Sequence, residues 1–405
     1  MKKTTWGLGL WLALSMPAAQ AASQEIRALF QPDSTQPNKN TFVNKTPNSG
    51  YCATFPEQCA ATNMFSIRVP MRFDSTRPLR YGDSIPVKVP SLWRQITVTN
   101  QDTQETETVE VRIMGVGSNY VLSRPAFEIV GVTDPRQGHE FLWSTKSWVY
   151  APPPCQYSGV GNYSTDGKSY RFFWKAPKEV DCAKVSNYYI PSMYFDTLDF
   201  AYELRTPNPL GMSSGLYTGA IAYSVGPGGD FSLGPLFTAD DGLLNLDFVL
   251  DVQHTLKVDL PPGGNKVSLE PEGGWAPWIN SGRKPTRIFR DQLFYISASS
   301  RFKVMLLCSS NGGNDCSMFS PKGDTAQFQV FITLPPGITG PGGPVTRHPL
   351  NYNNWAGPFQ PDLYVDRKAG SLNFDMTPFA INFLLRPGKN DTLSGNVTII
   401  WDSDV

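Results

Sequence analysis

Ser394-Gly-Asn-Val-Thr-Ile-Ile-Trp-Asp-Ser-Asp-Val405 is the stretch that decides the predicted fold. Val397, Ile399 and Trp401 recur at a period of two, which is typical of a β-strand with two different faces. We expect this strand to begin at Gly395 and to form an open sheet edge. Such an edge is an aggregation hazard unless the protein uses it to accept a strand from another chain.

Residues 1–21 have the pattern of a secretory signal peptide. Met1-Lys-Lys3 is positively charged, the run from Trp6 to Met16 is short and apolar, and Ala19-Gln-Ala21 is a small-residue cleavage site. The apolar run is shorter than the roughly 18 residues that a membrane helix needs. We therefore expect cleavage after Ala21 and export of residues 22–405.

The 6 cysteines lie in three local pairs along the sequence. Because an even number of cysteines in an exported chain indicates disulfides, we predict Cys52–Cys59, Cys155–Cys182 and Cys308–Cys316. Other connectivities stay open at this point. The alternative of a zinc site is disfavoured because no pair has a two-residue gap and the chain has only 3 histidines. We expect no metal and no cofactor.

The composition indicates an all-β protein. The chain contains 35 Gly, 35 Pro, 24 Phe, 16 Tyr and 10 Trp, and its short β-branched and aromatic runs end at prolines and glycines. The net charge of zero argues against nucleic acid as a partner. Because 405 residues exceed one usual β-domain, we predict two, a β-sandwich over residues 22–245 and a second domain over 246–405.

Several strands are predicted from local patterns. Leu243–Val252 and Tyr170–Trp174 are apolar runs of strand length, and the Cys155–Cys182 loop encloses the latter. Phe127–Val132 and Trp148–Tyr150 are predicted as strands on the same grounds.

The second half carries motifs of a known family. Asn208-Pro-Leu-Gly211 and Ser214-Gly-Leu-Tyr-Thr-Gly219 precede a strand, and Val252–Val258 looks like the start of a pilin module. With the export signal and the final strand, the chain resembles the two-domain tip subunits of chaperone–usher pili. It departs from many pilins in having Asp404 and Thr392 where they carry Tyr and Gly, which suggests a branch nearer the initiator subunits of enterotoxigenic-type pili.

This resemblance implies an N-terminal adhesin domain and a C-terminal Ig-like pilin domain that lacks its last strand. The implied partners are a periplasmic pilus chaperone, an outer-membrane usher, the N-terminal extension of the next pilin subunit and a host-surface receptor, in most cases a glycan. Chaperone and subunit would contact Val397, Ile399 and Trp401, and the carboxylate of Val405 would meet basic residues of the chaperone. The implied location is the fimbrium tip, reached through the periplasm.

The sequence contains few features that are typical of an enzyme. None of the histidines His139, His254 and His348 lies in a recognisable nucleophile or metalloprotease motif, and no phosphate loop is present. A secreted carbohydrate-binding or glycoside-cleaving protein is the alternative from another class, and a ligand-free structural pilus subunit is the third. The final strand alone is also compatible with an ordinary edge strand of a complete sandwich.

A receptor site is predicted between residues 143 and 174, the densest aromatic segment. A sugar-binding site needs exposed aromatic faces beside polar side chains. The candidate residues are Tyr157, Asn162, Tyr163, Asp166, Trp148 and Trp174. For Trp148 and Trp174, a place in the core is the alternative. Trp275 and Trp278 lie in the second domain and are expected to be structural.

Overall fold

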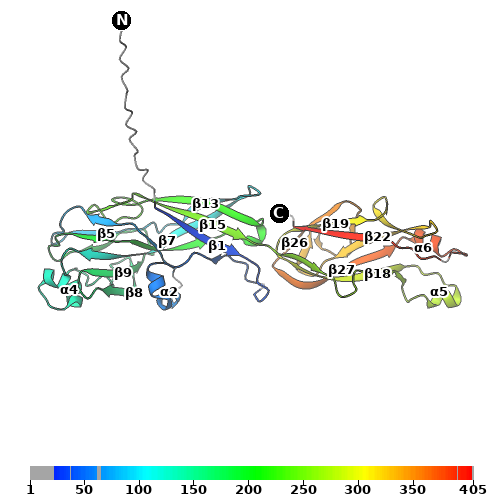
Figure 1. Ribbon diagram of the computed structural model, residues 1–405, viewed down its shortest axis with the longest axis horizontal. Coiled ribbons are helices and arrows are strands. Elements are labelled where there is room, and N and C mark those ends of the chain that lie inside the picture. The colour runs from blue at the N-terminus through cyan, green and yellow to red at the C-terminus, as the bar shows by residue number, and fades with distance from the viewer. Residues whose placement is uncertain (1–21, 37, 62–64, 390, 404–405) are drawn as a thin grey trace, which may run out of the picture.

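The computed structural model describes residues 22–403, apart from residues 37, 62–64 and 390. The predicted signal peptide and Val405 lie outside the described residues. Two β-rich domains follow one another along the long axis of the molecule (Figure 1). Within the described part of the chain, no helix is both long enough and apolar enough to span a membrane.

The first domain is a large, mostly antiparallel β-structure with a few short helices. Its strands are β1 Ala22–Phe30, β2 Val43–Asn44, β3 Ile67–Val69, β4 Phe73–Ser75, β5 Ser84–Val87, β6 Arg94–Asn100, β7 Thr106–Leu122, β8 Gln156–Tyr163, β9 Ser169–Lys175, β10 Cys182–Val185, β11 Met193–Phe195, β12 Leu198–Arg205, β13 Gly215–Ser224, β14 Phe237–Ala239 and β15 Leu243–Val252. Its helices are α1 Tyr51–Thr54, α2 Pro56–Ala61, α3 Ala126–Val130, α4 Pro135–Phe141 and the 3₁₀ turn η1 Pro209–Gly211.

Strand β7 organises this domain because it pairs with β6, β9, β11 and β12 along its 17 residues. The strand order β14-β4-β11-β7-β6-β13-β15-β1-β2 places the N-terminal strand next to β15. Strand β1 runs parallel to β15, from the pair Ala22–Leu244 to the pair Phe30–Val252. The first domain therefore incorporates its own N-terminal strand into the sheet, beside its last strand.

The second domain consists of two packed sheets. Its elements are β16 Leu256–Asp259, β17 Glu270–Pro271, α5 Ala276–Ser281, β18 Ile288–Ala298, β19 Phe302–Cys308, β20 Asn311–Gly312, β21 Asp315–Phe319, β22 Thr325–Thr333, β23 Ile338–Gly340, β24 Gly343–Pro344, β25 His348–Leu350, β26 Trp355–Pro361, β27 Val365–Met376, α6 Pro378–Leu384 and β28 Val397–Ser403. One sheet has the order β16-β18-β27-β22-β21-β20 and the other the order β24-β23-β26-β19-β28. The all-β, two-domain prediction is confirmed.

The structure moves the predicted domain boundary. Position 245 falls inside β15, which pairs with both β1 and β13 up to Val252. The buried core of the first domain ends at Val252, and that of the second begins at Ile288. The boundary therefore lies between Val252 and Leu256. His254 contacts both sides there, with Nε2 2.9 Å from the Met212 carbonyl oxygen and Nδ1 3.0 Å from the Ser299 hydroxyl.

Two strand predictions in the first domain are wrong. Residues 127–130 of the stretch predicted as Phe127–Val132 belong instead to helix α3, which begins at Ala126. Pro125 precedes the helix and Gly131 ends it with a φ of 83°, a left-handed conformation that suits glycine. Trp148–Tyr150 lies in a turn region rather than in a strand.

The predicted disulfides are present, and together they use all six cysteines of the chain. Cys52–Cys59, Cys155–Cys182 and Cys308–Cys316 have Cα–Cα distances of 5.6, 5.8 and 5.7 Å, which are within the usual range for disulfides. Cys155–Cys182 encloses β9, as expected, and joins the start of β8 to β10.

Candidate functional site

The last strand borders an open groove in the second domain. Among the described residues, β28 pairs only with β19, so its other edge is free of strand partners. Val397, Ile399 and Trp401 pack against the domain core and are only partly buried. The predicted alternation is confirmed, because Thr398 and Asp402 on the opposite face are exposed.

The groove has a volume of about 600 Å³ and reaches the core of the domain. Phe294, Phe328 and Phe374 line it from β18, β22 and β27, and each is almost completely excluded from water. The ring of Trp401 lies edge-on to Phe294, with centroids 5.1 Å apart. A groove with such walls is an interruption of the sandwich core rather than a surface depression.

The opposite rim of the groove is formed by the edge of the other sheet. Val258 in β16 and the following Leu260, Val267 and Leu269 line this rim. Leu260 is 48% exposed, although it is a large apolar side chain. Two sheet edges therefore face each other across a strip of apolar side chains, and the free edge of β28 offers unpaired backbone donors and acceptors.

The structure corrects the receptor-site prediction at Trp148 and Trp174. Both side chains are completely buried and stack with ring centroids 5.0 Å apart. The Trp174 indole donates a hydrogen bond to the Trp148 carbonyl oxygen at 2.6 Å. Because no ligand can reach either ring in this structure, the two residues belong to the core and not to a binding surface.

Tyr157 is one of the predicted residues that the structure leaves accessible. Its side chain is 58% exposed on β8, and it stacks with the exposed Tyr150 at a centroid distance of 6.0 Å. The amine of Lys146 lies 5.7 Å from the Tyr150 ring centroid. The two tyrosines therefore form an exposed aromatic surface with a cation beside it.

Asn162, Tyr163 and Asp166 lie at the opposite end of β8 from Tyr157. All three are exposed, but Asp166 closes the turn after β8, accepting hydrogen bonds from the Ser164 hydroxyl and from the Lys168 amide at 3.0 Å. These bonds lower the pKa of Asp166, the Ser164 hydroxyl most strongly. Because Tyr157 pairs with Trp174 and Tyr163 with Tyr170, about 13 Å of strand separates the two ends. The accessible predicted residues therefore lie at two places along β8.

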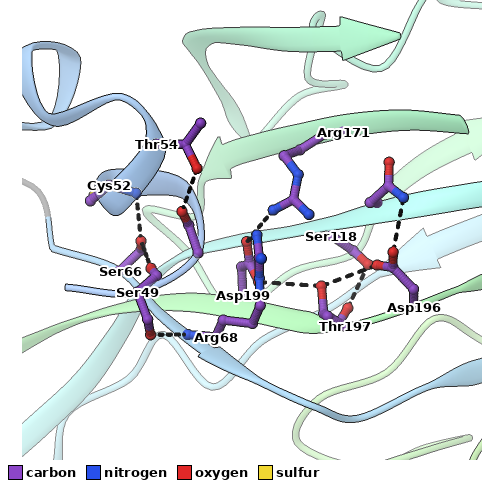
Figure 2. Close-up of polar contacts among 12 residues, drawn as sticks. Ser49, Cys52, Thr54, Ser66, Arg68, Ser118, Arg171, Asp196, Thr197 and Asp199 are labelled. Atoms are coloured by element: carbon purple, nitrogen blue, oxygen red, sulfur yellow. Dashed lines mark hydrogen bonds and ion pairs between the residues drawn. The ribbon is translucent and has the colours of Figure 1, made fainter. Parts of the chain in front are cut away.

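A polar cluster that the sequence analysis did not single out surrounds the buried Asp199 (Figure 2). Arg68 approaches its carboxylate with Nε at 2.9 Å and Arg171 with Nη1 at 3.2 Å. Burial raises the pKa of Asp199, and the charge of Arg68 acts in the opposite direction. The pairs join β3, β9 and β12.

The same cluster holds the first disulfide in place. The Ser66 hydroxyl accepts a hydrogen bond from the Cys52 amide at 2.8 Å and donates one to the Ser49 carbonyl oxygen at 2.6 Å (Figure 2). Gly50 passes so close to Asp199 that a Cβ atom would lie 2.7 Å from its Oδ2. The cluster therefore has a structural role in positioning α1.

No family model matches the chain. No curated protein matches it either. The described residues include no group of His, Cys, Asp or Glu side chains suited to holding a metal ion.

The chain is similar to solved structures of fimbrial tip adhesins over nearly its whole length. It covers 97% of a chain in the chaperone–tip adhesin complex of CFA/I fimbriae, with 95% of its own residues, 9% identity and a TM-score of 0.27. It covers 94% of CfaE, the adhesive subunit of the CFA/I fimbria of enterotoxigenic Escherichia coli, with 95% of its own residues, 8% identity and a TM-score of 0.27. It covers 98% of a chain in the CsuC–CsuE chaperone–tip adhesion subunit complex from Acinetobacter baumannii, with 94% of its own residues, 10% identity and a TM-score of 0.24.

These structures are of the kind that the sequence motifs resemble. Identities of 10% or less and TM-scores below 0.3 are nevertheless too low to transfer residues, ligands or partners. Function must therefore be argued from the geometry of this chain.

Proposed function

We propose that the protein is the tip adhesin of a fimbrium, which binds a surface receptor through its first domain and joins the fibre through its second. The open groove beside β28 is the observation that carries this proposal. It exposes core side chains and an unpaired strand edge in one place, and a strand from another chain satisfies both at once.

The inserted strand acts through two kinds of contact. Its backbone pairs with the free edge of β28, and its alternate side chains fill the space between Trp401 and the phenylalanines of the groove floor. A periplasmic chaperone supplies such a strand first, and the N-terminal extension of the next subunit then replaces it. The groove is thus the assembly site.

The first domain supplies the receptor-binding surface. Its exposed aromatic side chains, among them Tyr157 and Tyr163, offer flat apolar faces of the kind that sugars stack on. A glycan on a host or environmental surface is the proposed receptor. The predicted export signal and this division of labour support a location at the cell surface, at the end of the fibre.

Co-expression with the Ig-like pilus chaperone from the same genome tests the assembly role. The chain alone should aggregate or be degraded in the periplasm, and with the chaperone it should form a soluble one-to-one complex. Ile399→Asp should abolish this complex because it places a charge in the apolar groove. Recovery of a monomeric and fully stable chain without any partner would overturn the proposal.

Asp402→Ser is the matched control on the same strand. Asp402 lies on the opposite face of β28, where it is 50% exposed and pairs with Lys303 at 3.3 Å. Because an exposed ion pair contributes little to stability, this substitution should leave complex formation unchanged. Loss of the complex in this control as well would point to general misfolding rather than to the groove.

A further inference from the structure

A second hollow lies in the first domain, at the end that is farther from the second domain. It has a volume of about 580 Å³, within the roughly 300–1,000 Å³ of small-molecule sites. Helix α4, which contributes one wall, marks this end of the molecule (Figure 1). The segments that form the hollow are far apart in the sequence, and none of them was part of the predicted receptor site except the region around Trp143.

The walls of the hollow are held in place by backbone hydrogen bonds. The Gly82 amide donates to the Ser186 carbonyl oxygen at 2.8 Å, which joins the turn before β5 to the segment after β10. The Asn187 amide donates to the Leu142 carbonyl oxygen at 2.9 Å, and the Asn187 side chain donates to the Phe141 carbonyl oxygen at 3.1 Å. The hollow is therefore formed before any ligand arrives, which reduces the entropic cost of binding.

A buried lysine orders the remaining wall. The amine of Lys184 is inaccessible to water and shares its N–H donors among four acceptors, the Thr145 hydroxyl at 2.8 Å and the carbonyl oxygens of Thr145, Lys146 and Ser147 at 3.1 to 3.2 Å. These bonds hold Lys146 in a left-handed conformation with a φ of 58°. The exposed Lys146 side chain is thereby set at the rim of the hollow.

The lining combines exposed aromatic rings with polar groups. Tyr81 is 81% exposed and Phe141 is 48% exposed, which is unusual for side chains of this size. Glu140, Asn187 and Lys146 stand beside them. Among the residues that the structure describes, neither Glu140 nor Lys146 has an ion-pair partner. A purely apolar ligand would desolvate these charges without compensation, and the opposite charges favour a neutral ligand over an anion.

A neutral sugar fits this chemistry best. One face of a pyranose ring is apolar and stacks on an aromatic ring, whereas its hydroxyl rim donates to carboxylates and accepts from amides and amines. Lys146 also borders Tyr150, which stacks on Tyr157, so the aromatic surface continues from the hollow toward β8. The site accordingly has room for a chain of sugars.

We propose that this hollow is the principal carbohydrate subsite of the first domain, and that it holds one neutral pyranose between Tyr81 and Phe141 while the next sugar lies over Tyr150. This inference rests on the proposed adhesin function. It replaces a general aromatic binding surface by one particular site and one class of ligand.

The test uses the full chain in complex with its chaperone on a printed array of neutral and sialylated oligosaccharides. The complex should bind neutral oligosaccharides, and Tyr81→Ala and Phe141→Ala should each weaken that binding by about tenfold or more. Leu92→Ala is the control, because Leu92 is 64% exposed in the same domain but does not line the hollow. All three variants should keep the melting temperature of the parent.

The failures are distinguishable. Array binding that survives both Tyr81→Ala and Phe141→Ala would overturn the hollow as the subsite and leave the adhesin function standing. The absence of array binding by a complex that still adheres to cells would overturn a carbohydrate as the ligand. Failure to form the chaperone complex at all would instead contradict the proposed function.

Discussion

The pairing of strands at the sheet edges differs between the two domains. In the first domain, β1 adds to β15 in a parallel register of nine residue pairs, and the short β2 follows it. In the described part of the second domain, β28 ends its sheet with one side unpaired and with core residues open beside it. The first domain places its own strand β1 beside β15, whereas the second has an open groove beside β28, where we propose that another chain adds a strand.

Under the proposed function, this difference separates a receptor-binding domain from an assembly domain. A strand that is paired on both sides, as β15 is with β1 and β13, has no free backbone edge, whereas an exposed edge next to an apolar groove favours pairing with another chain. The two behaviours are separated at Val252–Leu256, where one buried core ends and the other has not yet begun.

Separate expression of the two domains should give the largest difference. A fragment of residues 22–254 should be monomeric and unfold cooperatively, because its sheet is completed by β1. A fragment of residues 255–405 should aggregate, and fusion of an alternating apolar strand to it should raise its melting temperature sharply. Size-exclusion chromatography and thermal circular dichroism measure both. Equal stability of the two fragments would remove the contrast.

Trp174→Ala should be the most damaging single substitution in the first domain. The ring is fully buried against Trp148, and loss of a buried aromatic side chain costs about 3–5 kcal/mol. Urea unfolding of the 22–254 fragment measures this cost, and secretion should fall with it. A loss below about 1 kcal/mol would show that the ring is not part of the core.

Removal of the Cys155–Cys182 disulfide should come next. It closes a loop with a sequence separation of 27, larger than the separations of 7 and 8 for the other two disulfides. Replacement of both cysteines by serine should cost about 3 kcal/mol in the chain-entropy model, more than for either other pair. Urea unfolding of the three double variants ranks them, and a different order would show that loop length is not decisive.

The stability of the first domain should also fall in acid through His139. The ring is buried, with Nδ1 2.8 Å from the Tyr120 hydroxyl, and burial lowers its pKa from 6.5 to about 4. As the pH falls from 6.5 to 4, the unfolded state therefore binds a proton that the folded state does not, and the free energy of unfolding falls by up to about 3 kcal/mol.

His139→Gln isolates this contribution from the carboxylates that titrate in the same range. Urea unfolding of the parent and the variant between pH 7 and pH 4 should show a shallower loss of stability in the variant. Parallel pH profiles would mean that His139 titrates normally in the folded state.

The smallest effect on stability is expected at the exposed end of β8. Tyr163→Ala and Asp166→Ala should change the free energy of unfolding by less than about 1 kcal/mol, because both side chains are exposed. Adhesion to host cells should weaken in both if this end takes part in receptor binding. Unchanged adhesion would place the receptor site elsewhere in the first domain.

Local patterns predicted those parts of the molecule in which neighbours in sequence decide the structure. The period of two in the last strand correctly placed Val397, Ile399 and Trp401 toward the core. The pattern of Leu243–Val252 predicted β15 to the residue. The same pattern did not reveal to which domain β15 belongs, because this depends on pairing with β1 more than 200 positions away.

The errors also have physical causes. An apolar run such as Phe127–Val132 fits a strand or a helix, and only the flanking Pro125 and Gly131 favour the short helix that forms. Trp148 and Trp174 were candidates for binding because composition cannot separate an exposed ring from a buried one. The hollow at Tyr81 escaped prediction altogether, since its walls come from segments that meet only in the folded domain.

The parallel pairing of β1 with β15 has a kinetic consequence. The amide of Ala22 donates to Asp241 at 2.6 Å across a sequence separation of 219. Closing so long a loop is entropically unfavourable, and folds dominated by contacts of high sequence separation form slowly. Strand β1 can pair with β15 only after β15 has been synthesised. While the chain emerges N-terminus first, residues 22–30 therefore remain unpaired with β15 until almost the whole domain has emerged.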